Sequence, residues 1–91
     1  DYNVVFIDPP WQNGLNDSYK KYTNLKLFLG TDPIETICNN LMNGTYNRKP
    51  NVIVLKLPKN YDINYFYKSI LNNKNIYYYD LKKMIILVIV V

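Results

Sequence analysis

The chain has 91 residues, one cysteine, no histidine and a formal net charge of +4, from 11 Lys and Arg against 7 Asp and Glu. This length allows one small domain at most, and without histidine the Ser-His-Asp and Cys-His types of nucleophilic site are excluded within these residues. One cysteine excludes an internal disulfide and a cysteine-rich zinc site. We therefore expect no bound metal and a reducing intracellular compartment, with nucleus, cytoplasm and a viral origin left open.

The first predicted element is a strand at residues 4–7 that ends in a rigid turn. Its sequence, VVFI, is an unbroken apolar run, which is typical of a strand covered on both faces in a parallel sheet. Pro9 and Pro10 end the strand because neither can donate a backbone hydrogen bond. Asp8 and Trp11 flank the turn at the carboxyl end of the strand, where ligands bind in open α/β sheets.

This turn suits the recognition of a flat molecule that carries an amino group. The Asp8 carboxylate and the Pro9 carbonyl only accept hydrogen bonds, so together they can bind both hydrogens of an exocyclic NH2. The Trp11 indole offers a face on which a base can stack, a contact of about 1–3 kcal/mol. The alternative is a double-proline turn in which Asp8 is a cap and Trp11 packs in the core.

A polar loop at residues 12–23 and a short extended segment precede the first predicted helix, at residues 31–43. Asp32 is its predicted N-cap, Pro33 occupies the first helical position, and Glu35 completes a capping box. Apolar residues at helical spacing predict the face that packs on a sheet. They are Ile34, Ile37, Cys38, Leu41 and Met42, and Cys38 is therefore expected in the core rather than in a catalytic site.

The remaining residues predict a strand, a helix and a hairpin. The strand spans residues 51–57 and ends at Pro58-Lys59-Asn60, at the same edge of the sheet as Asp8. Asp62 is the predicted N-cap of the second helix, whose apolar stripe is Ile63, Phe66, Tyr67, Ile70 and Leu71. After a turn at 72–75, strands at 76–79 and 84–91 are close enough in sequence to pair antiparallel. The last apolar run is far shorter than the roughly 20 residues that cross a bilayer, so we expect no membrane contact.

The order strand, helix, strand, helix, strand, strand predicts an α/β fold. Two βα units followed by an antiparallel hairpin form half of a doubly wound sheet. The chain begins directly before a predicted buried strand and ends inside an apolar run. We therefore expect residues 1–91 to be a piece of a longer domain.

The sequence resembles the S-adenosylmethionine-dependent amino-methyltransferases, whose motif IV, (D/N/S)-P-P-(Y/F/W), follows an apolar strand. That group includes adenine-N6, cytosine-N4 and glutamine-N5 enzymes. The element order is similar to the C-terminal half of a Rossmann-like class I methyltransferase, strands four to seven, with the cofactor-loop half missing. The closest resemblance is to the cap-guanine-N2 methyltransferases, or trimethylguanosine synthases. It lies in the segments FIDPPW, DSYKKY, GTDPIETIC and NVIVLKLPKNYDI.

The resemblance implies RNA cap methylation, the transfer of methyl from S-adenosylmethionine to N2 of the 7-methylguanosine cap of an RNA. Asp8, Pro9 and Pro10 would be the catalytic residues, with Asp8 also at the cofactor. Trp11 would stack on the 7-methylguanine base. The residues implied at the cap phosphates are Tyr19 or Tyr22, Lys59, and Lys82 or Lys83, with Asn60 supporting the site. Gln12-Asn13-Gly14 replaces the Gly-Gly of the family, which leaves the assignment of Tyr19 open.

Two alternatives stay open. One is an adenine-N6 methyltransferase that acts on DNA or RNA, and the other is an inactive cap-binding module with a methyltransferase-like fold. The glycine-containing cofactor loop and the ribose-binding acid of such a fold are absent from these residues. We therefore expect that the 91 residues alone neither bind S-adenosylmethionine tightly nor turn over.

Overall fold

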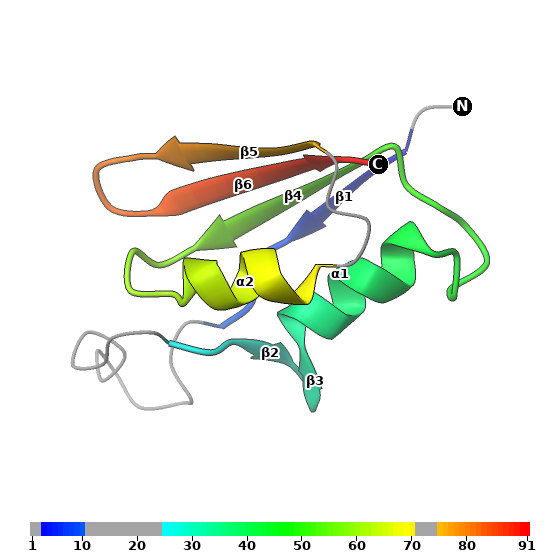
Figure 1. Ribbon diagram of the computed structural model, residues 1–91, viewed down its shortest axis with the longest axis horizontal. Coiled ribbons are helices and arrows are strands. Elements are labelled where there is room, and N and C mark those ends of the chain that lie inside the picture. The colour runs from blue at the N-terminus through cyan, green and yellow to red at the C-terminus, as the bar shows by residue number, and fades with distance from the viewer. Residues whose placement is uncertain (1–2, 11–24, 71–74) are drawn as a thin grey trace.

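A computed structural model describes residues 3–10, 25–70 and 75–91 of the chain. Within them the fold is α/β, as predicted, and a mixed four-stranded sheet carries two helices on one face (Figure 1). The strands of this sheet are β1 (Val4–Ile7), β4 (Val52–Leu57), β5 (Asn75–Asp80) and β6 (Ile85–Val90). The helices are α1 (Ile34–Met42) and α2 (Ile63–Ser69), and a small sheet of β2 (Phe28–Leu29) and β3 (Asp32–Pro33) precedes α1.

The strand pairing brings three loops to one edge of the sheet. The strand order is β1-β4-β6-β5, with β1 parallel to β4 and β6 antiparallel to both of its neighbours. The predicted terminal hairpin is therefore confirmed. Leu57 and Asp80 both lie opposite Ile85, so β4 and β5 end at the same level, and β1 runs in the same direction. We call this edge the rim and define it as residues 8–10, 58–60 and 81–84.

The core lies between the helices and one face of the sheet. Alternate residues of β4 and β6 are buried because successive side chains of a strand point to opposite faces. Cys38 is fully buried on α1, which confirms its predicted place in the core. The buried core residues are Ile7, Leu27, Ile34, Cys38, Ile53, Leu55, Leu57, Tyr61, Phe66, Ile70, Ile85, Leu87 and Ile89.

The first strand differs from its prediction. Val4 and Phe6 are 55% and 61% exposed, whereas Ile7 is buried. Within the described residues, β1 is an edge strand that pairs only with β4, and the helices cover only one of its faces. The prediction of a strand covered on both faces is therefore wrong for the part of the chain that the structure describes.

The start of the first helix also differs from its prediction. Gly30 adopts a φ of +64°, and the chain turns there so that Asp32 pairs with Leu29 in the small sheet. Asp32 consequently belongs to β3, and α1 begins at Ile34 without a side-chain cap. The predicted capping box of Asp32 and Glu35 is wrong, because strand pairing competes for the same residues. The predicted end of the helix at Asn43 is confirmed by the Asn43 C-cap.

The second helix agrees with the sequence pattern. The Asp62 carboxylate accepts a hydrogen bond from the backbone N–H of Tyr65 at 3.1 Å, as expected of an N-cap. Phe66 is fully buried and lies edge-on to the ring of Tyr61, with centroids 6.3 Å apart. Leu71 and residues 72–74 of the predicted turn at 72–75 lie outside the described residues, whereas Asn75, predicted as the end of that turn, is the first residue of β5.

We predict that Phe66→Ala lowers the free energy of unfolding by about 3–5 kcal/mol, because the core would be left with a cavity. Urea denaturation followed by circular dichroism measures this loss. Asn64 on the same helix is exposed, so Asn64→Ala is the matched control and should change stability by less than about 0.5 kcal/mol. Equal stability of the two variants would contradict the described core.

Candidate functional site

The rim holds the predicted Asp-Pro-Pro turn beside the end of the second long strand. Pro9 and Pro58 are both fully buried, one after β1 and one after β4. The Asp8 side chain is exposed, as is Pro10. Because both prolines are held in the core and fix their own φ angles, the two turns have little freedom at the point where they leave the sheet. The arrangement presents a carboxylate to solvent at the carboxyl ends of two parallel strands.

The described residues place some of the predicted substrate contacts at the same rim. Lys59 and Asn60 follow β4, and Lys82 lies exposed in the turn between β5 and β6. The structure therefore brings Asp8, Lys59, Asn60 and Lys82 to one edge of the sheet, although their roles stay predictions. Trp11, Tyr19 and Tyr22 lie outside the described residues.

An ion pair joins two parts of the rim. The Lys59 ammonium lies 2.8 Å from the carboxylate of Asp80, at the end of β5. Both side chains are about half exposed, at 46% and 57%, and exposed pairs of this kind contribute little to stability. The pair therefore keeps Lys59 near the hairpin but is weak enough to be broken. An anionic ligand at the rim would compete with Asp80 for the Lys59 ammonium.

Backbone hydrogen bonds tie the segment after residue 24 to the rim. The Leu25 N–H donates to the Asn60 carbonyl at 2.8 Å, and the Asp62 N–H donates to the Leu25 carbonyl at 2.9 Å. These bonds make a short parallel bridge between Leu25 and Tyr61. The chain that leaves the Asp-Pro-Pro turn thus returns, at residue 25, beside the loop that follows β4.

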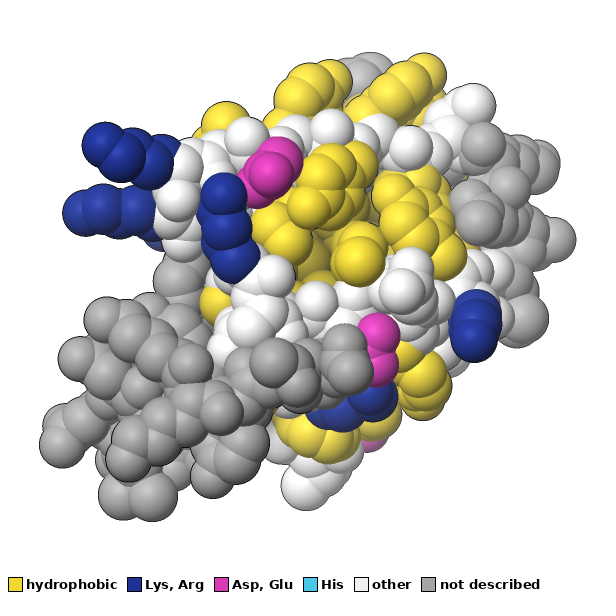
Figure 2. Space-filling model, turned by 60° about the vertical axis from the view of Figure 1, so that its left-hand side comes forward, with side chains coloured by type: hydrophobic (Ala, Val, Ile, Leu, Met, Phe, Trp, Pro, Cys, Tyr) yellow, Lys and Arg dark blue, Asp and Glu magenta, His cyan; other side chains and the backbone are white. Residues whose placement is uncertain are grey.

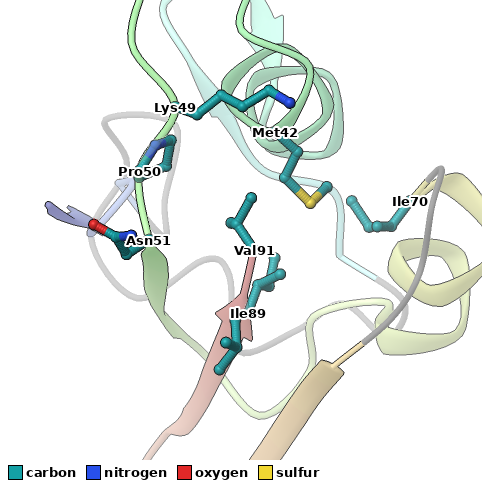
Figure 3. A pocket seen from close by; sticks show the side chains of 8 residues that line it. Met42, Lys49, Pro50, Asn51, Ile70, Ile89 and Val91 are labelled. Atoms are coloured by element: carbon teal, nitrogen blue, oxygen red, sulfur yellow. The ribbon is translucent and has the colours of Figure 1, made fainter. Parts of the chain in front are cut away.

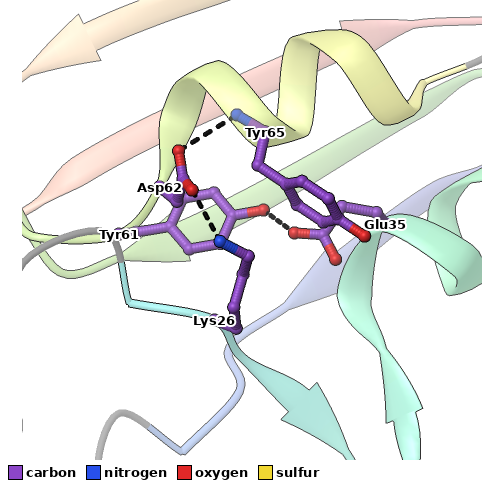
Figure 4. A network of polar contacts seen from close by, with 5 residues as sticks. All are labelled: Lys26, Glu35, Tyr61, Asp62 and Tyr65. Atoms are coloured by element: carbon purple, nitrogen blue, oxygen red, sulfur yellow. Dashed lines mark hydrogen bonds and ion pairs between the residues drawn. The ribbon is translucent and has the colours of Figure 1, made fainter.

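Side chains strengthen this junction (Figure 4). The Lys26 ammonium lies 2.6 Å from the Asp62 carboxylate and 4.6 Å from the centre of the Tyr65 ring. The hydrogen bond from Lys26, followed by that from the Tyr65 backbone N–H, lowers the pKa of Asp62. Asp62 consequently has two functions, as the N-cap of α2 and as the anion that anchors Lys26.

A buried acid lies behind the rim. Glu35 is only 3% exposed, and its carboxylate accepts a hydrogen bond from the hydroxyl of Tyr61, which is equally buried (Figure 4). Burial, and then the Glu35 hydrogen bond, raises the pKa of Tyr61 far above its ordinary value. The hydroxyl therefore stays protonated and remains a donor. This contact joins α1 to the loop that carries Lys59 and Asn60.

Sequence reasoning missed this pair because it assigned Glu35 to a capping box. The helical spacing did indicate that Glu35 faces the core. Cys38 and Met42 follow Glu35 by three and seven residues, so the three side chains share one face of the helix. An acid on the apolar face of a helix needs a hydrogen-bond donor. Burial, and to a lesser extent the Glu35 carboxylate, raises the pKa of the neighbouring Cys38 thiol to about 12, so this thiol is not a reactive thiolate.

A cavity of about 360 Å³ lies at the opposite edge of the sheet (Figure 3). Its lining includes Met42, Ile70 and Val91, with Lys49 and Asn51 as its main polar members. The Asn51 side-chain oxygen already accepts a hydrogen bond from the Asn3 backbone N–H at 2.6 Å. Among the described residues, none of the side chains that line this cavity is acidic, whereas the rim carries the exposed Asp8 carboxylate.

Residues 3–10, 25–70 and 75–91 show neither a metal site nor a membrane-spanning helix. Within these ranges, no group of three or more acidic, cysteine or histidine side chains could hold a metal ion. Neither α1 nor α2 has the length and apolar character needed to cross a membrane.

Comparison with known proteins finds a viral relative. Over 87 residues, or 96% of the chain, the sequence is 37% identical to an uncharacterized protein of Acanthamoeba polyphaga mimivirus. The chain spans 31% of the length of that protein. No protein-family model matches the chain, and no solved structure matches it. The relative's name states no activity.

We predict that Tyr61→Phe lowers the free energy of unfolding by about 1–3 kcal/mol, because it leaves the buried Glu35 carboxylate without this donor. Urea denaturation at neutral pH measures the change. Tyr65→Phe removes a hydroxyl from an exposed tyrosine (42%) and should be nearly neutral. If both variants were equally stable, the buried pair would not be a stabilising contact.

We predict that the Lys26–Asp62 pair stabilises the fold in a pH-dependent way. The pKa of Asp62 is lower in the folded chain, so its contribution is present above about pH 4 and is lost as the pH falls through the lowered pKa. Asp62→Asn keeps a capping oxygen but removes the charge. The stability difference between the native chain and this variant should shrink steadily below about pH 4 in urea denaturation, and a difference that stays constant would refute the ion pair.

Proposed function

We propose that the protein is an S-adenosylmethionine-dependent methyltransferase that acts on the exocyclic N2 amine of a 7-methylguanosine RNA cap. The observation that carries this proposal is the exposed Asp8 carboxylate at the carboxyl end of β1, at the same edge of the sheet as the Pro58-Lys59-Asn60 turn that follows β4. An acidic group in a double-proline turn, with a lysine at the same edge of the sheet, has acceptors for an amine and a cation for cap phosphates. The α/β architecture with its terminal antiparallel hairpin agrees with the C-terminal half of a class I methyltransferase.

The chemistry requires the rim to orient an amine. When bound, S-adenosylmethionine supplies an electrophilic methyl group, and the amine nitrogen forms the new N–C bond while the S–CH3 electron pair stays on sulfur. The Asp8 carboxylate and the Pro9 carbonyl would hold the two amine hydrogens and direct the nitrogen lone pair outward. As the nitrogen becomes positively charged, the Asp8 carboxylate stabilises that charge before the proton leaves.

The described residues fit only part of a cofactor site. Asp8 is exposed at the edge where α/β sheets bind ligands, so its carboxylate could reach a donor bound there. The three glycines of the chain, Gly14, Gly30 and Gly44, form no Gly-x-Gly pattern, so no nucleoside-binding loop of that type is present. We expect most of the cofactor site to lie in chain beyond these residues, which span 31% of the length of the viral relative.

An adenine-N6 methyltransferase is the second candidate. The same pair of acceptors would orient the N6 amine of adenine, and the DPPW sequence does not distinguish the two bases. The cap enzyme is favoured by the segment PKNYDI, which joins Lys59 to the N-cap Asp62 and resembles the cap-guanine family. A non-catalytic module would bind the cap and transfer no methyl group.

The proposal is tested with the full-length protein that carries these residues, given S-adenosylmethionine and either a 7-methylguanosine cap analogue or an adenine oligonucleotide. We expect methyl transfer to the cap analogue alone, with a rate that falls about 100-fold in Asp8→Ala, because a charge-stabilising group is lost at the reacting nitrogen.

Asp32 is an exposed acid in the small sheet, away from the rim. Asp32→Ala should therefore keep the native rate. Transfer to adenine would establish the second candidate, and cap binding without transfer would establish the inactive module.

A further inference from the structure

The face of the sheet that points away from the helices carries aromatic side chains at its edges. Strand register defines this open face, because its residues alternate with the buried ones of β4 and β6. Phe6, Val54, Val88 and Tyr77 lie opposite one another in one row across the four strands. The next row toward the rim consists of Lys56, Ile86 and Tyr79.

The tyrosines of β5 are the unusual feature of this face. Tyr77 and Tyr79 are 49% and 51% exposed although they belong to an edge strand of a well-packed sheet. They are two residues apart on one face, which separates them by about 7 Å along the strand. In the view of Figure 2, hydrophobic side chains reach the molecular surface, and lysine or arginine side chains project at one end of the molecule.

The charge next to these tyrosines is positive. Lys82 and Lys83 are exposed in the turn that follows β5, and Lys56 shares a row with Tyr79. Asp80 is the nearby acid of β5, and it is paired with Lys59. Exposed rings beside exposed lysines such as Lys82 and Lys83 are the combination by which sheet surfaces bind single-stranded nucleic acid, with bases stacked on the rings and phosphates near the cations.

We propose that the open face at β5 binds the single-stranded RNA that continues from the cap, with bases stacked on Tyr77 and Tyr79. This inference rests on the proposed function, because a cap at the rim is what would bring the RNA to this strand. β5 is three strands away from β1, about 14 Å, so the first nucleotides after the cap would pass the turn with Lys82 and Lys83 before they reach the tyrosines.

A second copy of the chain is a less suitable occupant of this surface. In a dimer that packed β5 on β5, the lysine-containing turns of the two copies would either lie close together and repel each other, or lie apart with no negative charge from the partner beside them. An RNA chain supplies one negative charge with each base, so its bases can stack on the tyrosine rings while its phosphates lie near the lysines. Self-association through the tyrosines would nonetheless overturn the proposal, and light scattering of the protein used in the binding test detects it.

The test compares three probes on the full-length protein: a cap analogue, a capped RNA of about ten nucleotides, and the same RNA without its cap. We expect the capped RNA to bind at least tenfold more tightly than the cap analogue. The double variant Tyr77→Ala, Tyr79→Ala should lose this advantage while its affinity for the cap analogue stays within about twofold. Tyr46 is 46% exposed and lies between α1 and β4, so Tyr46→Ala is the matched control and should bind all three probes normally.

Two further variants separate stacking from folding. Tyr77→Leu with Tyr79→Leu keeps apolar side chains but removes the rings, and it should lose the RNA advantage, whereas the corresponding phenylalanine variant should retain it. Equal affinity for the cap analogue and the capped RNA would overturn the proposal, as would an advantage that survives in the leucine variant.

The same data distinguish this proposal from the proposed function. If the uncapped RNA bound as tightly as the capped one and still needed the two rings, RNA binding at the open face would be supported and cap recognition at the rim would be contradicted. If methyl transfer to the cap analogue were normal and the capped RNA bound no more tightly than the cap analogue, cap methylation would be supported and RNA binding at the open face would be contradicted.

Discussion

Parallel pairing of β1 with β4 decides where Asp8 and Lys59, two of the described candidate residues, lie. Because the two strands run in the same direction, their carboxyl ends reach one edge, and each ends in a turn that begins near a buried proline. Asp8 and Lys59 thereby lie at the same edge of the sheet although they are 51 positions apart in sequence. A pair of antiparallel strands would have placed these two turns at opposite edges of the sheet, and no common site could form.

The second turn is held by polar contacts that the apolar core alone would not provide. Glu35 reaches Tyr61 from α1, and Lys26 reaches Asp62 from the segment that follows the first loop. One of these contacts is buried and the other is partly exposed, so they respond differently to solvent and pH. Together they join three parts of the chain behind the rim, which keeps the turn at Lys59 in place while its own side chain stays exposed.

Local patterns predicted most of the fold, and contacts between distant segments account for the rest. β4, the α2 cap at Asp62 and the terminal hairpin each follow from residues that are neighbours in sequence. The exposure of Phe6 could not be predicted, because it depends on what covers the other face of the sheet. The start of α1 was mispredicted because the pairing of β2 with β3 competes with helix capping. The partner of Glu35 is 26 residues away, and no local pattern identifies it.

The most direct test of the central claim is a crystal structure of the full-length protein with a 7-methylguanosine cap analogue and S-adenosylhomocysteine. If the rim is an amine-binding site, the N2 amine of the guanine will lie within hydrogen-bonding distance of the Asp8 carboxylate and the Pro9 carbonyl. Its phosphates will lie on the side of Lys59. A cap analogue bound elsewhere, such as in the cavity beside Lys49, or a rim closed by another part of the protein, would contradict the account.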